Sequence, residues 1–257
     1  MYDEYEFVCE LKRCNNDIAR QNELWDQFKP SMTSFAKKAQ WAYHHYLKKI
    51  HLTDSELNFT DEFLNNWYQF YLNTIHETEQ SVLPTESLHR TILIGWHFPE
   101  YPQLAEMVDK LDILVLIASE HSWLLEKLKE ENVLLFRKEG PSSKLLRAFA
   151  AHRPIYAMLD YCYSTSPSLD VDFLGYPAKT PFGLIKLAIR FGYQFKFVNI
   201  DNKKLLIKNF EGSDFLEVQE VLQFFNKEIE TAIMKSPSRW LLWPSVDNRW
   251  QNVDYDL

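Results

Sequence analysis

From about residue 85 onward, short apolar runs alternate with stretches of helical periodicity. The runs are apolar throughout, as expected for strands that are buried on both faces of a sheet. The predicted strands cover residues 91–96, 112–118, 132–136, 154–159, 194–200 and 203–209. Strands that alternate with helices indicate βαβ units. The sequence therefore predicts an α/β fold with a mostly parallel central sheet flanked by helices.

The stretches between these runs have apolar residues at helical spacing. The predicted helices cover residues 103–110, 121–129, 141–151, 181–191 and 214–235. Gly192 is placed as a helix C-cap, and Asp201-Asn202 predicts a hairpin turn between the last two strands. Residues 161–180 have no clear period, so we predict a functional loop there.

The chain before residue 85 has a different pattern. Residues 25–49 and 61–79 carry apolar and aromatic side chains three and four positions apart, which predicts amphipathic helices. We therefore divide the chain into an N-terminal helical segment, residues 1–85, packed on an α/β core, residues 86–257.

Composition excludes several classes of function. A formal net charge of −8 argues against general nucleic-acid binding, which usually needs a basic face. The chain has only 6 glycines and neither a GxGxxG nor a GxxxxGK[ST] pattern, so no nucleotide cofactor is expected. No metal-binding motif stands out either.

Cysteines and hydrophobic patterning bear on location. The three cysteines, Cys9, Cys14 and Cys162, fit neither a zinc site nor a disulfide framework, which favours a reducing compartment. The N-terminus is acidic, unlike a signal peptide, and no apolar run approaches the ~18 residues of a membrane span. We expect a cytoplasmic protein, with peripheral membrane contact left open.

Polar residues follow the first four predicted strands. They are His97 with Glu100, residues 119–121, Arg137 with Lys138, and Asp160. Ligands of open α/β sheets gather beyond the carboxyl ends of the strands, so we expect these side chains to share one edge.

His97 with Glu100 is the strongest candidate pair at this edge. A neutral imidazole can take a proton from a hydroxyl or amine, and a carboxylate on its other nitrogen fixes the tautomer. Arg137 or Lys138 could stabilise an oxyanion, and Asp160 could shape the pocket floor or order a nearby cation. The alternative for His97 is a purely structural hydrogen bond at a strand end.

Other residues allow further hypotheses. Cys162 could be a nucleophile with His97 as its base, although a cysteine between two tyrosines is more often packed. Residues 119–121 (Ser-Glu-His) contain triad residue types without a GxSxG elbow. Residues 44–45 (His-His) are a weak metal candidate. The last group consists of Trp240, Trp243 and Trp250, which either anchor a membrane face or, more in keeping with indole burial, pack the tail on the domain.

The stretch 145–212 resembles the LpxL/HtrB-like lipid A biosynthesis acyltransferases. Residues 155–160 (IYAMLD) are similar to that family's apolar strand ending in Asp, and residues 172–181 (DFLGYPAKTP) to its FfGxpaxTp segment. Residues 237–243 and 249–250 resemble its closing Pro-x-x-Trp-x-Trp and Arg-Trp elements. The similarity extends over roughly residues 88–250.

The resemblance implies a His-x4-Asp/Glu motif after the first strand, with the histidine as general base. His97 falls at the position of that histidine. Pro102 stands where the acid is expected, and Glu100 is the nearest carboxylate.

We therefore expect an acyltransferase that takes its acyl group from acyl carrier protein or coenzyme A and passes it to a small or carrier-bound amine or hydroxyl. In this hypothesis His97 and Glu100 are catalytic, and Arg137, Lys138 and Asp160 bind substrate. A catalytically lapsed accessory protein that binds an acyl chain or carrier protein is the first alternative. Thioester hydrolysis is the second.

Overall fold

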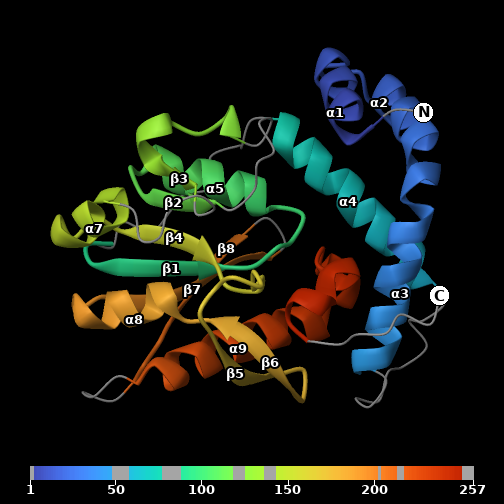
Figure 1. Cartoon of the computed structure of the whole chain (residues 1–257). Coiled ribbons are helices and arrows are strands. Elements are labelled where there is room, and N and C mark those ends of the chain that lie inside the picture. Colours follow the sequence, from blue (N-terminus) through green and yellow to red (C-terminus); the bar gives the residue numbers. More distant parts are fainter. Residues whose placement is uncertain are drawn as a thin grey trace.

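The computed structural model describes residues 3–47, 58–76, 88–117, 125–135, 143–201, 204–212 and 217–250. Within these ranges the chain has an α/β fold, which confirms the predicted class. A six-stranded sheet has the order β3-β2-β4-β1-β7-β8 (Figure 1). Five strands are parallel, and β8 runs antiparallel to β7.

The strands of the main sheet lie within the predicted runs or differ from them at the ends. They are β1 (Thr91–Gly95), β2 (Leu114–Ile117), β3 (Val133–Leu135), β4 (Ile155–Met158), β7 (Gln194–Asp201) and β8 (Lys204–Asn209). Every residue of β1 and β2 is buried, which explains why these segments are apolar without alternation.

The described helices of the α/β region are shorter than their predicted ranges, or begin earlier; the predicted helix over residues 121–129 falls partly outside the described residues. They are α5 (Tyr101–Lys110), α7 (Ser143–Ala150), α8 (Gly183–Arg190) and α9 (Val218–Lys235). Helix α5 contacts β2, and α9 contacts both β7 and α8. Gly192 has a φ of 68° directly beyond α8, consistent with its predicted role at the helix end.

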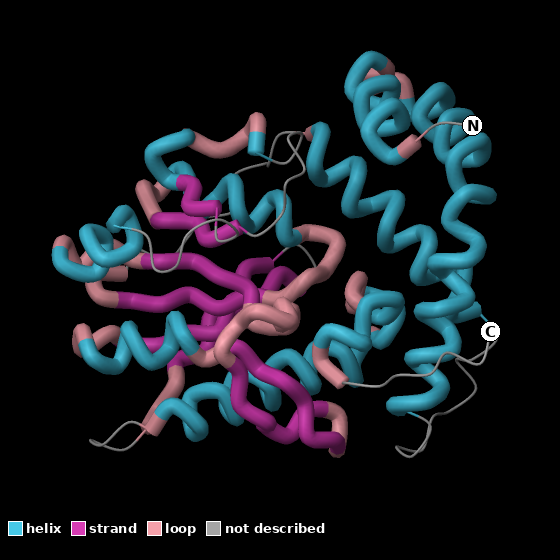
Figure 2. Tube along the Cα trace, viewed as in Figure 1, coloured by secondary structure: helices cyan, strands magenta, loops and turns pink. Residues whose placement is uncertain are grey.

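The predicted loop over residues 161–180 is wrong for most of its length. Strands β5 (Ser168–Phe173) and β6 (Tyr176–Pro181) form an antiparallel hairpin separate from the main sheet (Figure 2). Leu174 and Gly175 both have positive φ at the turn, 53° and 76°, as tight two-residue hairpin turns require. A period-two signal was present in the sequence, because buried Val171 and Phe173 alternate with exposed aspartates.

The N-terminal segment is helical, as predicted. Its helices are α1 (Glu4–Arg13), α2 (Ile18–Phe28), α3 (Thr33–Leu47) and α4 (Phe59–Ile75), with the 3₁₀ turn η1 (Lys29–Met32) after α2. Within the predicted helical stretch 25–49, helices α2 and α3 are separated at Pro30, which lacks the N–H that an α-helix needs. Buried residues of these helices belong to the same hydrophobic cluster as the sheet.

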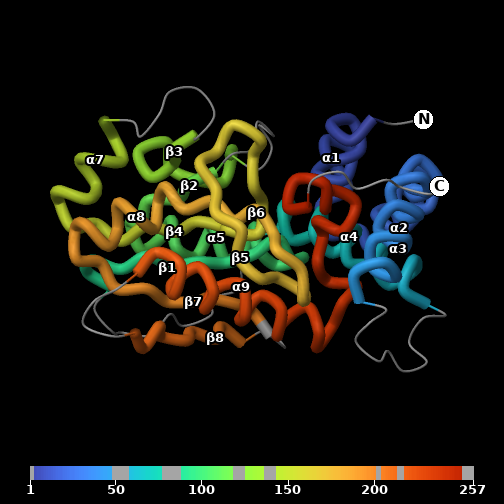
Figure 3. Tube along the Cα trace, turned by 60° about the horizontal axis from the view of Figure 1, so that its bottom comes forward, coloured from blue at the N-terminus to red at the C-terminus, as the bar shows by residue number. Residues whose placement is uncertain are grey.

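The C-terminal segment, residues 236–250, lies between the sheet and helix α3 (Figures 1 and 3). It contains the 3₁₀ turns η4 (Pro237–Arg239) and η5 (Trp243–Asn248). Turn η5 packs on α3, and turn η4 packs on α4 and α9. In Figure 1 the arrowheads of β1 and β4 point toward this segment. The segment is therefore placed to contact whatever follows those two strands.

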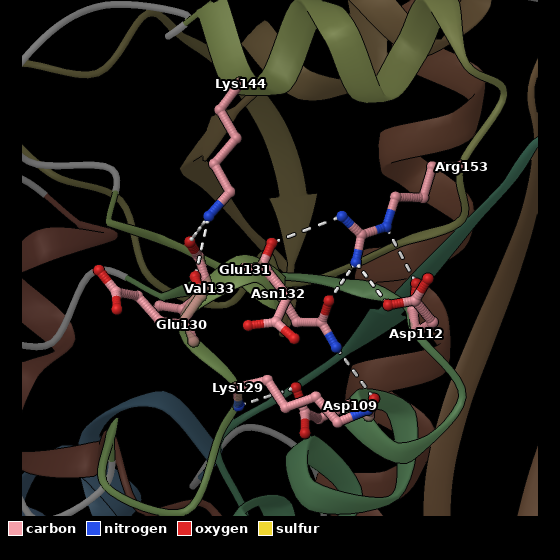
Figure 4. A network of polar contacts seen from close by, with 9 residues as sticks. All are labelled: Asp109, Asp112, Lys129, Glu130, Glu131, Asn132, Val133, Lys144 and Arg153. Carbon is pink, nitrogen blue, oxygen red and sulfur yellow. Dashed lines mark hydrogen bonds and ion pairs between the residues drawn. The ribbon is translucent and has the colours of Figure 1, made fainter.

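A polar network ties the edge strand β3 to its neighbours at the amino ends of the strands (Figure 4). Arg153 donates to the side chains of Asp112 and Asn132, and Asn132 donates to the carbonyl of Asp109 at 3.1 Å. Lys144 donates to the carbonyls of Glu130 and Val133 at 2.9 and 2.7 Å. The network satisfies backbone groups that an edge strand would otherwise leave without protein partners.

Gly95, the last residue of β1, is required by close packing. A Cβ atom there would lie 2.6 Å from the hydroxyl oxygen of Tyr156, which is fully buried. We expect Gly95→Ala to lower the free energy of unfolding by about 1–3 kcal/mol, because the core must shift to admit the methyl group. Denaturant unfolding measures this change.

Gly183→Ala is the matched control for that prediction. A Cβ at Gly183 would meet nothing within 4 Å and the position has no positive φ, so we expect little loss of stability. Equal losses in both variants would contradict the steric argument at Gly95.

Candidate active site

His97 and Asp160 meet at the carboxyl edge of the sheet. Strands β1 and β4 are parallel neighbours, and Gly95 is paired with Met158. Two residues beyond this pair, the chain reaches His97 after β1 and Asp160 after β4. The imidazole Nδ1 of His97 lies 2.8 Å from Oδ1 of Asp160. The strand order, not closeness in sequence, brings the pair together.

Asp160 is held on both carboxylate oxygens. Its Oδ2 accepts a hydrogen bond from the backbone N–H of His97 at 2.8 Å and from the indole N–H of Trp240 at 3.0 Å. The Asp160 side chain is 0% exposed, whereas the His97 side chain is 20% exposed. One partner is therefore locked inside the protein while the other reaches the surface.

The surroundings keep Asp160 ionised. Burial acts to raise the pKa of the carboxyl, but the charge interaction with His97 and the hydrogen bonds from His97 and Trp240 outweigh burial and lower the pKa. An ionised carboxylate can only accept hydrogen bonds, so Nδ1 of His97 carries the hydrogen. In the neutral form of the ring, Nε2 is therefore the basic nitrogen.

Tyrosine side chains surround the imidazole. The ring of Tyr101 lies edge-on to that of His97 at 5.3 Å, and the ring of Tyr161 is 6.4 Å away. Tyr161 in turn packs on Tyr163 at 4.6 Å. Burial raises the pKa of Tyr101 far above its usual range, so this phenol stays neutral. Two tyrosine rings thus lie beside the imidazole.

The C-terminal segment holds both members of the pair. Besides the Trp240 indole on Asp160, the N–H of Leu241 donates to the carbonyl of His97 at 3.1 Å. Beyond it, Ser238 donates to Glu62 of helix α4 at 3.1 Å and accepts from Asn66 at 3.2 Å. Helix α4 of the N-terminal segment is therefore hydrogen-bonded to the C-terminal segment that contacts His97 and Asp160.

Glu100 does not contact His97, contrary to the prediction that it would orient the imidazole. Its Oε2 pairs with Nη2 of Arg239 at 2.5 Å. Glu100 is the N-cap residue of helix α5, so the chain has already left the edge of the sheet at this position. Asp160, predicted to line the pocket floor, occupies the place expected for Glu100. Pro102, at the position where the resemblance implies an acid, is buried in the first turn of α5.

Several predicted residues lie outside the described ranges. Arg137 and Lys138 fall within residues 136–142, and the Ser-Glu-His sequence falls within residues 118–124. Strand β3 ends at Leu135, two positions before Arg137 in the sequence. Their role at an oxyanion stays a prediction.

Cys162 and the C-terminal tryptophans pack in the interior. Burial raises the pKa of the Cys162 thiol, which opposes thiolate formation, and its Sγ donates to the carbonyl of Tyr163 at 3.7 Å. This disfavours the nucleophile hypothesis. Trp240 and Trp243 are fully buried and Trp250 is 6% exposed, which confirms the packing interpretation of the tail.

The hydrogen bond from Trp240 to Asp160 was not predicted from the sequence. The tryptophan pattern was visible, but nothing in it indicates that one indole donates to a carboxylate. We expect Trp240→Phe to keep an aromatic ring in the core while removing a hydrogen bond to ionised Asp160. The pKa of Asp160 should rise, and the rate of a reaction that uses His97 as a base should fall by about tenfold.

Trp243→Phe is the control for Trp240→Phe, because its indole donates to the carbonyl of Pro237 and not to the pair. Carbon-detected NMR of the Asp160 carboxyl measures the pKa directly. An unchanged pKa in Trp240→Phe would show that the indole hydrogen bond does not stabilise the charge.

No protein-family model matches this sequence, and no curated protein matches it significantly. The resemblance to lipid A acyltransferases therefore stays a prediction from the residues quoted above. None of the helices in the described part of the chain is long and apolar enough to cross a membrane. In the same part, no three His, Cys, Asp or Glu side chains are grouped to hold a metal ion.

Proposed function

We propose that this protein is an acyltransferase that uses a thioester donor, with His97 as general base and Asp160 as the residue that orients it. The observation that carries the proposal is the buried carboxylate of Asp160, 2.8 Å from Nδ1 of a partly exposed His97. With Nδ1 bonded to Asp160, Nε2 is the nitrogen left to take a proton from an acceptor hydroxyl or amine.

The proposed reaction needs no covalent enzyme intermediate. Nε2 of His97 takes the proton of the acceptor as the acceptor oxygen or nitrogen attacks the thioester carbonyl. The tetrahedral intermediate collapses by breaking the carbon–sulfur bond, and the imidazolium returns the proton to the departing thiolate. Asp160 stabilises the imidazolium during the step. Arg137 or Lys138 would stabilise the oxyanion.

The neighbours of His97 support direct deprotonation of an acceptor. Among the residues that the structure describes, no serine, threonine or cysteine side chain is hydrogen-bonded to His97. The nearest thiol in sequence to Asp160, Cys162, is buried with a raised pKa. In that part of the chain no nucleophilic side chain is bonded to the base, which suits transfer to a bound acceptor.

The accessory-protein alternative drew its support from Pro102, which stands at the expected acid position. Asp160 weakens that argument, because a carboxylate from another strand completes the pair. Titratable pairs of this kind, with a buried carboxylate on a partly exposed histidine, cluster at catalytic sites. We therefore favour the enzyme.

Mass spectrometry of the purified chain with acylated carrier protein tests the proposal. Carrier proteins loaded with several acyl chain lengths, and the matching acyl-CoA thioesters, are incubated with and without a panel of amines and alcohols. Transfer predicts an acylated acceptor and a free thiol, both dependent on His97. Free fatty acid without acceptor dependence would indicate a hydrolase. Carrier-protein binding without turnover of any donor would indicate the accessory role.

A further inference from the structure

Arg249, near the end of the described chain, is a buried cation without an ion pair among the described residues. It is 1% exposed, and its guanidinium lies over the ring of Phe173 at 4.4 Å. Burial lowers its pKa to about 10, which still leaves it protonated at neutral pH. Burying a charge is unfavourable unless something balances it.

The hydrogen bonds of Arg249 go to neutral groups. Nη1 donates to the carbonyl of Leu159 at 2.9 Å, and Nη2 donates to Asn226 Oδ1 at 3.0 Å and to Thr180 Oγ1 at 3.2 Å. Its Nε, which is buried, has no hydrogen-bond partner among the described residues. These contacts join the end of β4 to β6 and α9.

No carboxylate lies within ion-pair distance of Arg249 in the part of the chain that the structure describes. Glu230, an acid whose field acts on Arg249, is engaged elsewhere. Its Oε1 accepts from the N–H of Leu174 at 2.6 Å, and its Oε2 pairs with Lys227 at 3.3 Å. Arg249 therefore lacks a direct counter-ion.

Asp160, in turn, is not bonded to a cation of fixed charge among the described residues. Its hydrogen-bond donors are two neutral N–H groups and the ring of His97, which carries a charge only when it is protonated. The carbonyl that Arg249 binds belongs to Leu159, the residue directly before Asp160. Arg249 thus binds the residue next to Asp160, the charge of Asp160 acts on Arg249, and neither buried charge has an ion-pair partner of fixed charge among the described residues.

We propose that Arg249 is a positioning residue for the His97–Asp160 pair. Its guanidinium holds the end of β4 and supplies the positive charge that balances ionised Asp160, which keeps His97 neutral at rest. This role rests on the proposed function, in which His97 must be neutral to act as a base. The charge balance itself is independent of that function.

The other titratable groups that act on this cluster do not supply the missing charge. Tyr101 and Tyr156, whose pKa values are raised first of all by burial, face Asp160 as neutral phenols. Cys162 and Glu230 act on Arg249, Glu4 and Tyr163 act on Tyr101, and Glu100 is paired with Arg239. In the described chain, Arg249 is the cation besides His97 placed to balance Asp160.

An NMR titration of the His97 ring in the full chain tests the proposal. We expect Arg249→Gln to raise the titration midpoint of His97 by about one pH unit, because the unbalanced carboxylate then favours the imidazolium. The acidic limb of the activity profile should shift by the same amount. Thr180→Val is the matched control, since it removes one acceptor from Arg249 but keeps the charge. An unchanged midpoint in Arg249→Gln would overturn the proposal.

A double-mutant cycle covers the case in which Arg249→Gln folds poorly. Thermal unfolding is measured for Arg249→Gln, Asp160→Asn and the variant with both changes. If the two charges balance each other, the drop in Tm caused by Arg249→Gln is clearly smaller in the Asp160→Asn background. Equal drops in both backgrounds would reduce Arg249 to a packing residue. Neither measurement needs turnover, so a failure of the proposed acyltransferase activity is separable from a failure of this inference.

Discussion

His97→Ala is expected to lower kcat/KM for acyl transfer by about 10²–10⁴-fold, the usual contribution of a positioned general base. The fold should be retained, because the His97 side chain is partly exposed and its backbone contacts to Asp160 and Leu241 remain available. The measurement is a steady-state assay with an acyl thioester, with circular dichroism and Tm recorded alongside. Turnover like that of the wild type would contradict the role of His97 as base.

Glu100→Gln is the matched control for His97→Ala. Glu100 is three residues away on the same connection, but its carboxylate pairs with Arg239 and does not contact the imidazole. We expect the rate to stay within a few-fold of the wild type. A loss as large as that of His97→Ala would mean that Glu100, and not Asp160, supports the base.

Asp160→Asn is expected to lower the rate by about 10³–10⁴-fold, a loss in the range expected for removal of the base. The amide can present its N–H to Nδ1, which selects the wrong tautomer of His97 and leaves Nε2 protonated. It also removes the negative charge that stabilises the imidazolium. Single-turnover kinetics, with the His97 tautomer assigned from ¹⁵N chemical shifts, would measure both effects. A fully active Asp160→Asn variant would exclude the pair as the catalytic unit.

The lowered pKa of Asp160 predicts that the stability of the fold depends on pH. Asp160 has a lower pKa in the folded protein than in the unfolded chain, so its ionised form stabilises the fold above the unfolded pKa. That contribution is lost as the pH falls from about 4 through the folded pKa. Denaturant unfolding of the wild type and of Asp160→Asn over this range should show a steeper acid loss in the wild type. Parallel profiles would contradict it.

The role of Asp160 illustrates how far sequence patterns reach. Both His97 and Asp160 are recognisable as polar residues that follow apolar strands, and the edge where such residues collect is predictable. The acid nearest to His97 in sequence, Glu100, was nevertheless the wrong partner. Strand β4 inserts between β1 and β2 in the sheet, and a linear sequence carries no direct record of that order.

The hairpin formed by β5 and β6 was missed for a different reason. Its period-two alternation was present, but flanking aromatic and proline residues obscured it, and Leu174 is an unusual residue for a positive φ. The contacts of Trp240 and Arg249 have no sequence signal of comparable strength. Both residues reach the site from the far end of the chain, so only folding could bring them there.

The amino-acid sequence by itself determined the fold class, the helical N-terminal segment, most strand positions and His97 as a candidate base. These follow from local properties, namely periodicity, burial pattern and the residue at a strand end. The tertiary structure decided the partner of His97, the donors to Asp160 and the burial of Arg249. They depend on which strands are neighbours and on where the C-terminal segment packs, because contacts between distant residues are set by the burial of the whole core.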